Sequence, residues 1–158
     1  MISGYDIALA QPADARDIAL LSREAIEYGL PWRWTERRVM RCIRDPATNV
    51  AIARWNGDLR GFAIMQYGDE EAHVLLFAVR VEQRRRGVGS ALLRWLEATA
   101  AVAGIHAIRL EARAGNASAR AFYGRHGFRE AGLSPGYYDE VEDAIRMVKD
   151  LRHRTQAG

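Results

Sequence analysis

The stretch that decides the fold is RRRGVGSALL at residues 84–93, which follows the strongly apolar run VLLFAV at residues 74–79. A helical pattern continues from there through residue 103. Gly87 and Gly89 therefore lie where a predicted strand passes into a predicted helix. Glycine lets the backbone approach a ligand closely because it has no Cβ. The first turn of a helix offers unpaired N–H groups and positive potential, so this junction predicts a phosphate or pyrophosphate site.

The same stretch departs from two common nucleotide-binding signatures at specific positions. A P-loop requires a lysine that reaches the terminal phosphate, and residues 84–93 contain no lysine. A dinucleotide fingerprint requires a third small residue where this chain has Leu92, and the acidic residue expected about 20 positions later is also missing. Both nucleotide signatures therefore fail, and the pyrophosphate is expected to belong to another ligand.

Length and composition predict one domain over residues 1–158, with a frayed tail at 152–158. No apolar window is long enough for a transmembrane helix, and the N-terminus lacks the pattern of a signal peptide. Cys42 is the only cysteine, which excludes an intrachain disulfide and favours a cytoplasmic protein. The net charge is +3, and the arginines are spread among acids. We therefore expect neither a nucleic-acid nor a membrane partner.

Hydrophobic periodicity predicts a mixed α/β sheet with the element order β-αα-βββ-α-β-α-ββ. The apolar run at 72–81 predicts a strand buried on both faces, and the sequence Ser134-Pro135-Gly136 is expected to separate the last two strands. Thr35 and Asn116 are predicted helix N-caps. The predicted strands are 6–10, 49–55, 59–67, 72–81, 105–113, 128–133 and 144–151, and the helices are 12–27, 36–44, 88–103 and 117–126.

Two motifs carry a resemblance to a known family. They are Arg84-x-x-Gly87-x-Gly89 and, further along, Asn116-x-x-Ala119-x-x-Phe122-Tyr123-x-x-x-Gly127-Phe128. In these motifs and in its element order the chain resembles the GNAT superfamily of N-acetyltransferases. The resemblance implies the GNAT fold, with a central mixed sheet flanked by helices, and transfer of an acetyl group from acetyl-CoA to a primary amine.

Residues 110–116 and 137–147 look like the corresponding blocks of the ribosomal-protein alanine N-acetyltransferases. This narrower resemblance implies a protein or peptide N-terminal α-amine as the acceptor. Val81, where the family usually has proline, and the loop Trp32-Arg33-Trp34 depart from the pattern. A small-molecule amine (a polyamine, amino acid or drug-like amine) therefore stays open as acceptor. A catalytically silent acyl-CoA-binding module also stays open, as does the choice between monomer and homodimer.

The resemblance implies acetyl-CoA as co-substrate and no metal. The backbone amides of residues 85–90 would hold the pyrophosphate, and residues 77–79 would pair with the pantetheine arm like an added strand. Amides near the thioester carbonyl would stabilise the oxyanion that forms on attack. The candidate cofactor-binding residues are Phe77, Ala78, Val79, Arg84, Arg85, Arg86, Gly87, Val88, Gly89, Ser90, Asn116 and Tyr123.

Tyr123 occupies the general-acid position of the superfamily. With a tyrosine pKa near ~10 it stays protonated at neutral pH and would protonate the leaving thiolate. Packing in the core is the alternative role for Tyr123.

Glu111, on the strand predicted at 105–113, is the candidate base, acting through water. An α-amine with a pKa near ~8 is already partly neutral at pH 7, so modest assistance suffices. Pairing with Arg109 or Arg113 is the alternative role for Glu111.

The acceptor side is predicted from two separate segments. Trp32 and Trp34, in the loop before the second helix, are candidate pocket residues, with plain packing as the alternative. Tyr138 and Glu142, near the last hairpin, are candidate acceptor contacts, with a solvated turn as the alternative. Acidic groups at this hairpin would favour a cationic acceptor.

Overall fold

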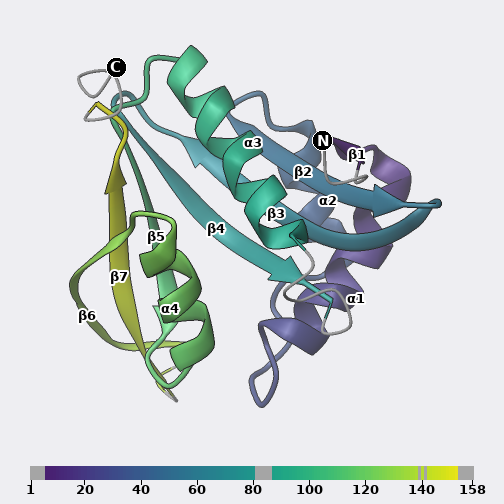
Figure 1. Ribbon diagram of the computed structural model, residues 1–158. Coiled ribbons are helices and arrows are strands. Elements are labelled where there is room, and N and C mark those ends of the chain that lie inside the picture. The colour runs from purple at the N-terminus through teal and green to yellow at the C-terminus, as the bar shows by residue number, and fades with distance from the viewer. Residues whose placement is uncertain (1–5, 81–86, 139, 141, 153–158) are drawn as a thin grey trace.

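The computed structural model describes residues 6–80, 87–138, 140 and 142–152. Within them, seven strands form one mixed sheet in the order β1-β2-β3-β4-β5-β7-β6. Helices α1 and α2 cover one face of this sheet, and α3 and α4 cover the other (Figure 1). The strands are β1 (Asp6–Leu9), β2 (Thr48–Trp55), β3 (Asp58–Tyr67), β4 (Glu71–Val79), β5 (Ala107–Arg113), β6 (Arg129–Tyr138) and β7 (Glu142–Asp150). The helices are α1 (Ala15–Ala25), α2 (Glu36–Arg44), α3 (Val88–Val102) and α4 (Ala117–Arg125), and a short 3-10 turn η1 (Pro12–Asp14) precedes α1.

The predicted element order and the mixed α/β class are confirmed. Local signals explain several boundaries. The Thr35 hydroxyl accepts the Arg38 amide at 3.4 Å at the start of α2, and the Asn116 side chain accepts the Ala119 amide at 3.0 Å at the start of α4. Both are the predicted N-caps. Asn56 and Gly57 have φ of 52° and 82°, which gives the tight hairpin that joins β2 to β3.

The prediction is wrong at the end of β6 and at the end of α3. Strand β6 does not end at residue 133 but continues through Ser134, Pro135 and Gly136 to Tyr138. It lies at the edge of the sheet, where a proline that lacks an N–H is tolerated, and its register shifts between Ser134 and Tyr138. Ala103 lies beyond the end of α3 and is exposed instead of facing inward.

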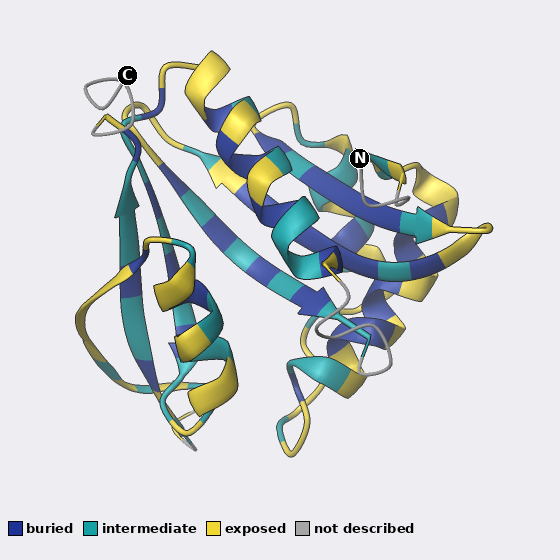
Figure 2. Ribbon diagram, in the orientation of Figure 1, coloured by how far each residue is buried: buried dark blue, intermediate teal, exposed yellow. Residues whose placement is uncertain are grey.

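Two hydrophobic cores lie on the two faces of the sheet. Leu92, Leu96 and Ile108 are fully buried between α3 and the sheet, and Ile18 and Phe62 are fully buried beneath α1 and α2. Strand β4 was expected to be buried on both faces, but its residues alternate between buried and partly buried, as Figure 2 shows. No helix among the described residues has both the length and the apolar character needed to cross a membrane.

The pairing of β4 with β3 contains one irregularity. Ile64 of β3 lies opposite Leu76, and the next residue, Met65, lies opposite Val74, so that Leu75 is an extra residue on β4. A bulge of this kind bends the strand that carries it. The parallel pairing of β4 with β5 accordingly covers only residues 71–74 and 107–110. Beyond Val74 the two strands diverge, as Figure 1 shows, and the sheet opens into two arms.

Candidate active site

A cavity of about 270 Å³ lies where β4 and β5 separate. Its walls come from the segment between α1 and α2, from β4 and β5, from α4 and from the end of β6. Five of the predicted site residues line it together: Trp34, Phe77, Glu111, Tyr123 and Tyr138. The splayed sheet therefore brings the predicted acid, the predicted base and part of the predicted acceptor side into one space.

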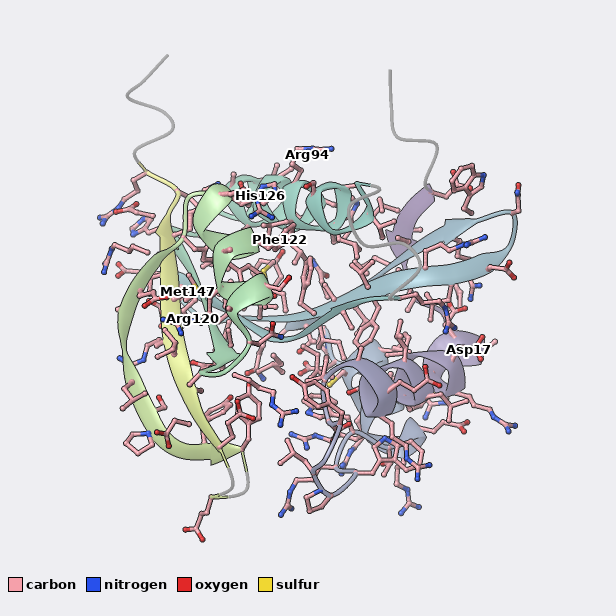
Figure 3. All side chains as sticks on the ribbon, turned by 60° about the horizontal axis from the view of Figure 1, so that its bottom comes forward. Asp17, Arg94, Arg120, Phe122, His126 and Met147 are labelled. Atoms are coloured by element: carbon pink, nitrogen blue, oxygen red, sulfur yellow. The ribbon has the colours of Figure 1, made fainter. Side chains whose placement is uncertain are left out.

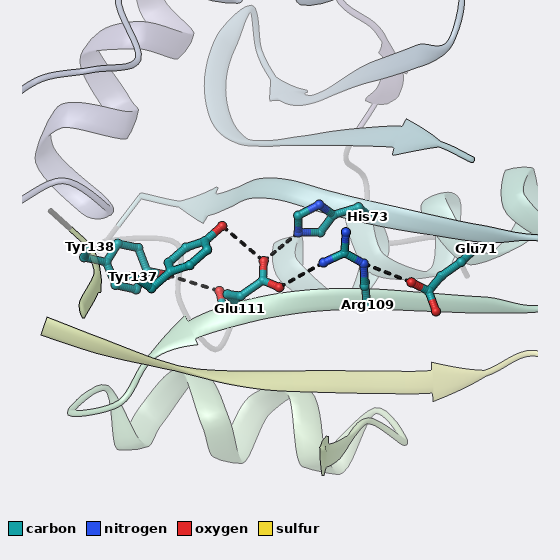
Figure 4. Close-up of polar contacts among 6 residues, drawn as sticks. All are labelled: Glu71, His73, Arg109, Glu111, Tyr137 and Tyr138. Carbon is teal, nitrogen blue, oxygen red and sulfur yellow. Dashed lines mark hydrogen bonds and ion pairs between the residues drawn. The ribbon is translucent and has the colours of Figure 1, made fainter. Parts of the chain in front are cut away.

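Glu111 is the centre of a polar network on the floor of this cavity (Figure 4). Its Oε1 lies 2.5 Å from Nε2 of His73 on β4 and accepts a hydrogen bond from the Tyr137 hydroxyl at 3.2 Å. Its Oε2 accepts a bond from Arg109 at 3.2 Å, and Arg109 also pairs with Glu71 at 2.9 Å. Its backbone carbonyl accepts a bond from the Tyr138 hydroxyl at 3.2 Å. Glu111 thus pairs with Arg109, as the alternative role proposed, and not with Arg113.

The network also sets the protonation of Glu111. The carboxyl side chain is only 6% exposed, and burial alone would raise its pKa. The hydrogen bonds and positive charge supplied by His73, Arg109 and Tyr137 outweigh burial and hold the pKa of Glu111 below its ordinary value. Glu111 is therefore ionised throughout the neutral pH range.

Tyr123 projects from α4 into a cluster of aromatic rings. Its ring centroid lies 5.8 Å from that of Phe77, 5.3 Å from that of Phe122 and 5.7 Å from that of Phe128, each in an edge-to-face arrangement. Burial, followed by the nearby Tyr138, raises the pKa of Tyr123 well above that of a free tyrosine. The hydroxyl is therefore a protonated donor at the edge of the cavity, held by packing.

Tyr137 and Tyr138 form the wall opposite the segment between α1 and α2. Their rings stand edge to face with centroids 4.9 Å apart. Burial, together with the negative charge of Glu111, raises the pKa of Tyr137 to about 12. Burial also raises the pKa of Tyr138. Both hydroxyls therefore stay protonated, and both donate to Glu111, one to its carboxylate and one to its backbone carbonyl.

The predicted phosphate cradle is the N-terminus of α3. Gly87 caps this helix with φ of 87°, a conformation that favours glycine. The first bond along the helix runs from the Ala91 amide to the Gly87 carbonyl at 3.0 Å, so the amides of the first turn have no partner within the helix. The predicted contacts Arg84, Arg85 and Arg86 lie outside the described residues. The described part of the cradle has the backbone geometry of an anion site.

Gly89 was expected to let a ligand approach the backbone, and the structure gives an additional reason for it. A Cβ at this position would lie 3.0 Å from Cζ of Phe122 and 3.6 Å from the side chain of Val79. The absent side chain therefore allows α3 to pack closely against α4. The neighbouring Ser90 hydroxyl lies 2.9 Å from Nε2 of His126 at the end of α4.

The open edge of β4 faces the gap between the two arms. The Arg80 amide donates to the Arg60 carbonyl of β3 at 2.9 Å. Since successive amides of a strand point to opposite edges, the amide of Phe77 points away from β3, toward β5. The pairing of β4 with β3 covers residues 76–79, whereas its pairing with β5 covers only residues 71–74. An extended ligand is able to add to this edge as a further strand would.

The remaining predicted acceptor residues lie outside the cavity. Trp32 is 38% exposed, and the guanidinium of Arg23 lies 5.0 Å from its ring centre. Glu142 accepts a hydrogen bond from Arg113 at 2.6 Å and another from the Gly115 amide at 3.2 Å. Neither side chain is among those that line the cavity.

Three residues of the site were missed from the sequence. His73 had been assigned no role, but the parallel register of β4 and β5 pairs it with Arg109, two positions before Glu111. Glu27 is buried, and its carboxylate accepts the amides of Arg33 at 2.7 Å and Trp34 at 3.2 Å, which fixes the loop of the cavity wall. Tyr137 lies inside a block that the sequence did single out. No local sequence pattern identifies His73 or Glu27 as a site residue. His73 contacts a residue far away in the chain, and Glu27 binds the backbone of an irregular loop.

Comparison with known proteins agrees with this geometry. A model of the acetyltransferase (GNAT) family matches residues 15–128, which is more than half of the chain. The chain is 41% identical to the [ribosomal protein bS18]-alanine N-acetyltransferase of Escherichia coli, over 73% of this chain and 79% of that protein. It is 35% identical to the N-alpha-acetyltransferase of Sulfurisphaera tokodaii, over 93% of each chain.

Two archaeal proteins extend the comparison. An uncharacterized N-acetyltransferase of Methanocaldococcus jannaschii is 38% identical, over 62% of this chain and 64% of that protein's length. Among solved structures, Ard1 from Thermoplasma volcanium is similar with a TM-score of 0.82 and 27% identity, over 93% of this chain and 97% of that one.

Proposed function

The chain belongs to the acetyltransferase (GNAT) family and is an N-acetyltransferase, and on this premise we propose that it acetylates the N-terminal α-amine of a protein or peptide. One observation carries the proposal: Glu111 and Tyr123 open into the same cavity, between the open edge of β4 and the segment that precedes α2. Relatives named for action on an N-terminal residue support this choice of acceptor.

The family uses acetyl-CoA, which supplies the acetyl group as a thioester, and the residues present fit it. The first-turn amides of α3, from Val88 to Ser90, suit a pyrophosphate, because they carry positive potential and lack partners within the helix. The Phe77 amide, at the open edge of β4, suits hydrogen bonding to an extended arm and to a carbonyl oxygen that gains negative charge. Asn116 is engaged as the cap of α4, which holds Tyr123 in position.

In the proposed mechanism Tyr123 is the general acid. Its raised pKa keeps the hydroxyl protonated, and the rings of Phe77, Phe122 and Phe128 fix its direction. A buried, protonated hydroxyl of this kind is suited to give its proton to a departing thiolate, which would otherwise leave as an anion in an apolar space.

Glu111 is the proposed base and acts through water on the proton of the acceptor amine. Its lowered pKa makes Glu111 a weak base. It would therefore orient the water and, through it, receive the proton of an amine that is already partly neutral. Nε2 of His73, 2.5 Å from the Glu111 carboxylate, is positioned to hydrogen-bond this negatively charged group or to pass a proton outward. An α-amine needs far less help from such a weak base than a lysine amine does, which supports the choice of an N-terminal acceptor.

An acceptor screen tests the proposal. The chain would be given acetyl-CoA with three classes of acceptor: peptides with a free N-terminus and no lysine, N-terminally blocked peptides with one lysine, and small free amines. Release of CoA thiol and mass spectrometry of the products would be measured. The free N-terminal peptides should be the best substrates. Preference for small amines would instead assign a small-molecule acetyltransferase, and acetyl-CoA binding without turnover on any class would indicate a silent module.

A further inference from the structure

Helix α2 carries an unusual concentration of arginine on its outward side. Successive residues of an α-helix are turned by about 100° from one another. Val39 is completely buried, and residues turned far from it point outward. Four arginines occupy this outward half. Arg37, Arg41 and Arg44 are exposed, and Arg38 is partly buried.

The charges of this arginine face are not neutralised by the protein. None of the four guanidinium groups forms an ion pair with a carboxylate among the described residues. Glu36 is the single acidic residue of α2, at its first position. Arg38 lies flat against the ring of Trp34, 3.8 Å from the ring centre, which orients its guanidinium without removing its charge. A surface of four positive charges is therefore available to a partner.

The arginine face begins at the cavity that contains Glu111 and Tyr123. Arg38 and Trp34 are part of the cavity wall. Arg37, Arg41 and Arg44 line a separate open groove along the outer side of α2, together with Met40 and the single acidic residue Glu36, so that positive charge predominates there. A chain that enters the cavity by its N-terminus and leaves past Arg38 would therefore run onto this face.

We propose that the acceptor of this N-acetyltransferase is a polypeptide with acidic residues shortly after its N-terminal residue, and that the arginines of α2 bind those acidic side chains. This inference rests on the proposed N-terminal acceptor. Arg37 and Arg44 are seven residues apart in a helix that rises 1.5 Å per residue, a span of about 10 Å. An extended peptide covers that distance in about three residues.

A nucleic acid fits this surface less well than an acidic peptide. Binding to a duplex through its phosphates commonly uses about 6–10 contacts with basic side chains, whereas α2 offers four arginines over about 10 Å. The arginine face also continues from a cavity suited to an amine, and a peptide carries an amine and carboxylates on one chain. These observations favour the peptide.

The test compares three peptides that share one N-terminal residue and contain, at positions 2–5, two acidic residues, their two amide counterparts or two lysines. Acetylation would be followed at low and at moderate salt. Exposed charge pairs are individually weak, so two of them should raise kcat/KM of the acidic peptide about tenfold over the amide peptide. The advantage should shrink as salt is added.

Variants locate the effect on α2. Exchanging both Arg41→Glu and Arg44→Glu should reverse the order, so that the lysine peptide becomes the best substrate. Arg41→Lys with Arg44→Lys should keep the original order, because the charge is retained. The matched control is Arg94→Glu on α3, an exposed arginine on the opposite side of the sheet from α2, as Figure 3 shows. It should leave the order of the three peptides unchanged.

The outcomes are distinguishable. Equal kcat/KM for the three peptides would overturn this inference and leave the proposed N-terminal acceptor standing. No transfer to any peptide, with transfer to free amines, would overturn the proposed function and this inference with it. Equal rates on the peptides, together with RNA binding that Arg41→Glu and Arg44→Glu abolish, would assign the arginine face to a nucleic acid instead. Should the double glutamate variant fail to fold, as judged by circular dichroism, Arg41→Gln with Arg44→Gln would replace it and should abolish the preference.

Discussion

Arg113, on β5, donates a hydrogen bond from Nη1 to the backbone carbonyl of Tyr28 at 2.8 Å, across the two arms of the splayed sheet. The same nitrogen reaches the carbonyl of Ile26 at 3.1 Å, and Nε donates to Glu142 at 2.6 Å. The guanidinium also lies 3.8 Å from the ring centre of Tyr28. One side chain therefore ties the segment before α2 to the β6–β7 hairpin, and both segments contribute residues to the wall of the cavity.

Replacing Arg113 by glutamine should loosen those two segments. We expect the acceptor KM to rise about tenfold and the free energy of unfolding to fall by about 1–3 kcal/mol, because two backbone carbonyls and the Glu142 carboxylate lose a charged donor. Affinity for acetyl-CoA, measured by calorimetry, should change little, since α3 and β4 are untouched. Arg129→Gln, at an exposed arginine of β6, is the control. An equal loss of acetyl-CoA affinity would show a general structural effect instead.

Tyr123→Phe removes one hydroxyl and keeps the aromatic cluster. If Tyr123 is the acid, kcat should fall by about 10²-fold or more, while the dissociation constant of acetyl-CoA stays within about twofold. Steady-state thiol release and calorimetry give the two numbers. Phe128→Leu, which disturbs the same cluster without touching the hydroxyl, separates packing from chemistry. A full-rate Tyr123→Phe enzyme would remove Tyr123 as the acid.

The pH dependence of the rate follows from the lowered pKa of Glu111. Burial alone would raise this pKa, but the bonds with His73, Arg109 and Tyr137 lower it. Glu111 then stays ionised near neutral pH, so a fall in rate between pH 8 and pH 6 would come from protonation of the acceptor amine. Glu111→Gln should reduce kcat by about 10- to 100-fold and leave that fall in place. Profiles of kcat/KM against pH decide this, and a profile that loses the fall would contradict it.

The same network predicts how acid weakens the protein. A carboxyl whose pKa is lower in the folded state contributes stability above its unfolded pKa and loses it as pH falls through the folded value. The unfolding free energies of the native protein and Glu111→Gln should therefore differ most at neutral pH and converge below pH 4.5, the ordinary value for this group. Urea denaturation at several pH values measures the difference. A gap independent of pH would mean that packing, not charge, explains it.

Gly89→Ala should disturb the predicted phosphate cradle at the N-terminus of α3 by a steric clash with Phe122. The new methyl group would lie 3.0 Å from Cζ of Phe122, so α3 or the ring must move, at a cost of about 1–3 kcal/mol. Acetyl-CoA affinity should fall with it. The double variant Gly89→Ala, Phe122→Leu should recover part of both losses, because the smaller side chain vacates the space. Thermal unfolding and calorimetry on the four proteins test the coupling, and additive effects would refute it.

The features that depend on neighbours in the chain were predicted from the sequence. Thr35 and Asn116 form the predicted caps, and Asn56-Gly57 forms the turn between the strands predicted at 49–55 and 59–67, because each interaction spans only a few residues. The helix start at Gly87 follows from glycine geometry in the same way. The course of β6 through Pro135 was mispredicted, since an edge strand tolerates a residue that local propensity treats as a break.

The sequence by itself determined the order of the elements, and it identified the N-terminus of α3 as a candidate anion site and Glu111 and Tyr123 as candidate catalytic residues, because periodicity and motifs are local. Only the tertiary structure decided what surrounds them. The parallel register of β4 and β5 before the bulge brings His73 to Glu111 across 38 residues of chain, and beyond the bulge at Leu75 the two strands part. Arg113 likewise reaches Tyr28 across 85 residues. Such contacts depend on which strands lie side by side and where they part, and that is settled by packing of the whole sheet.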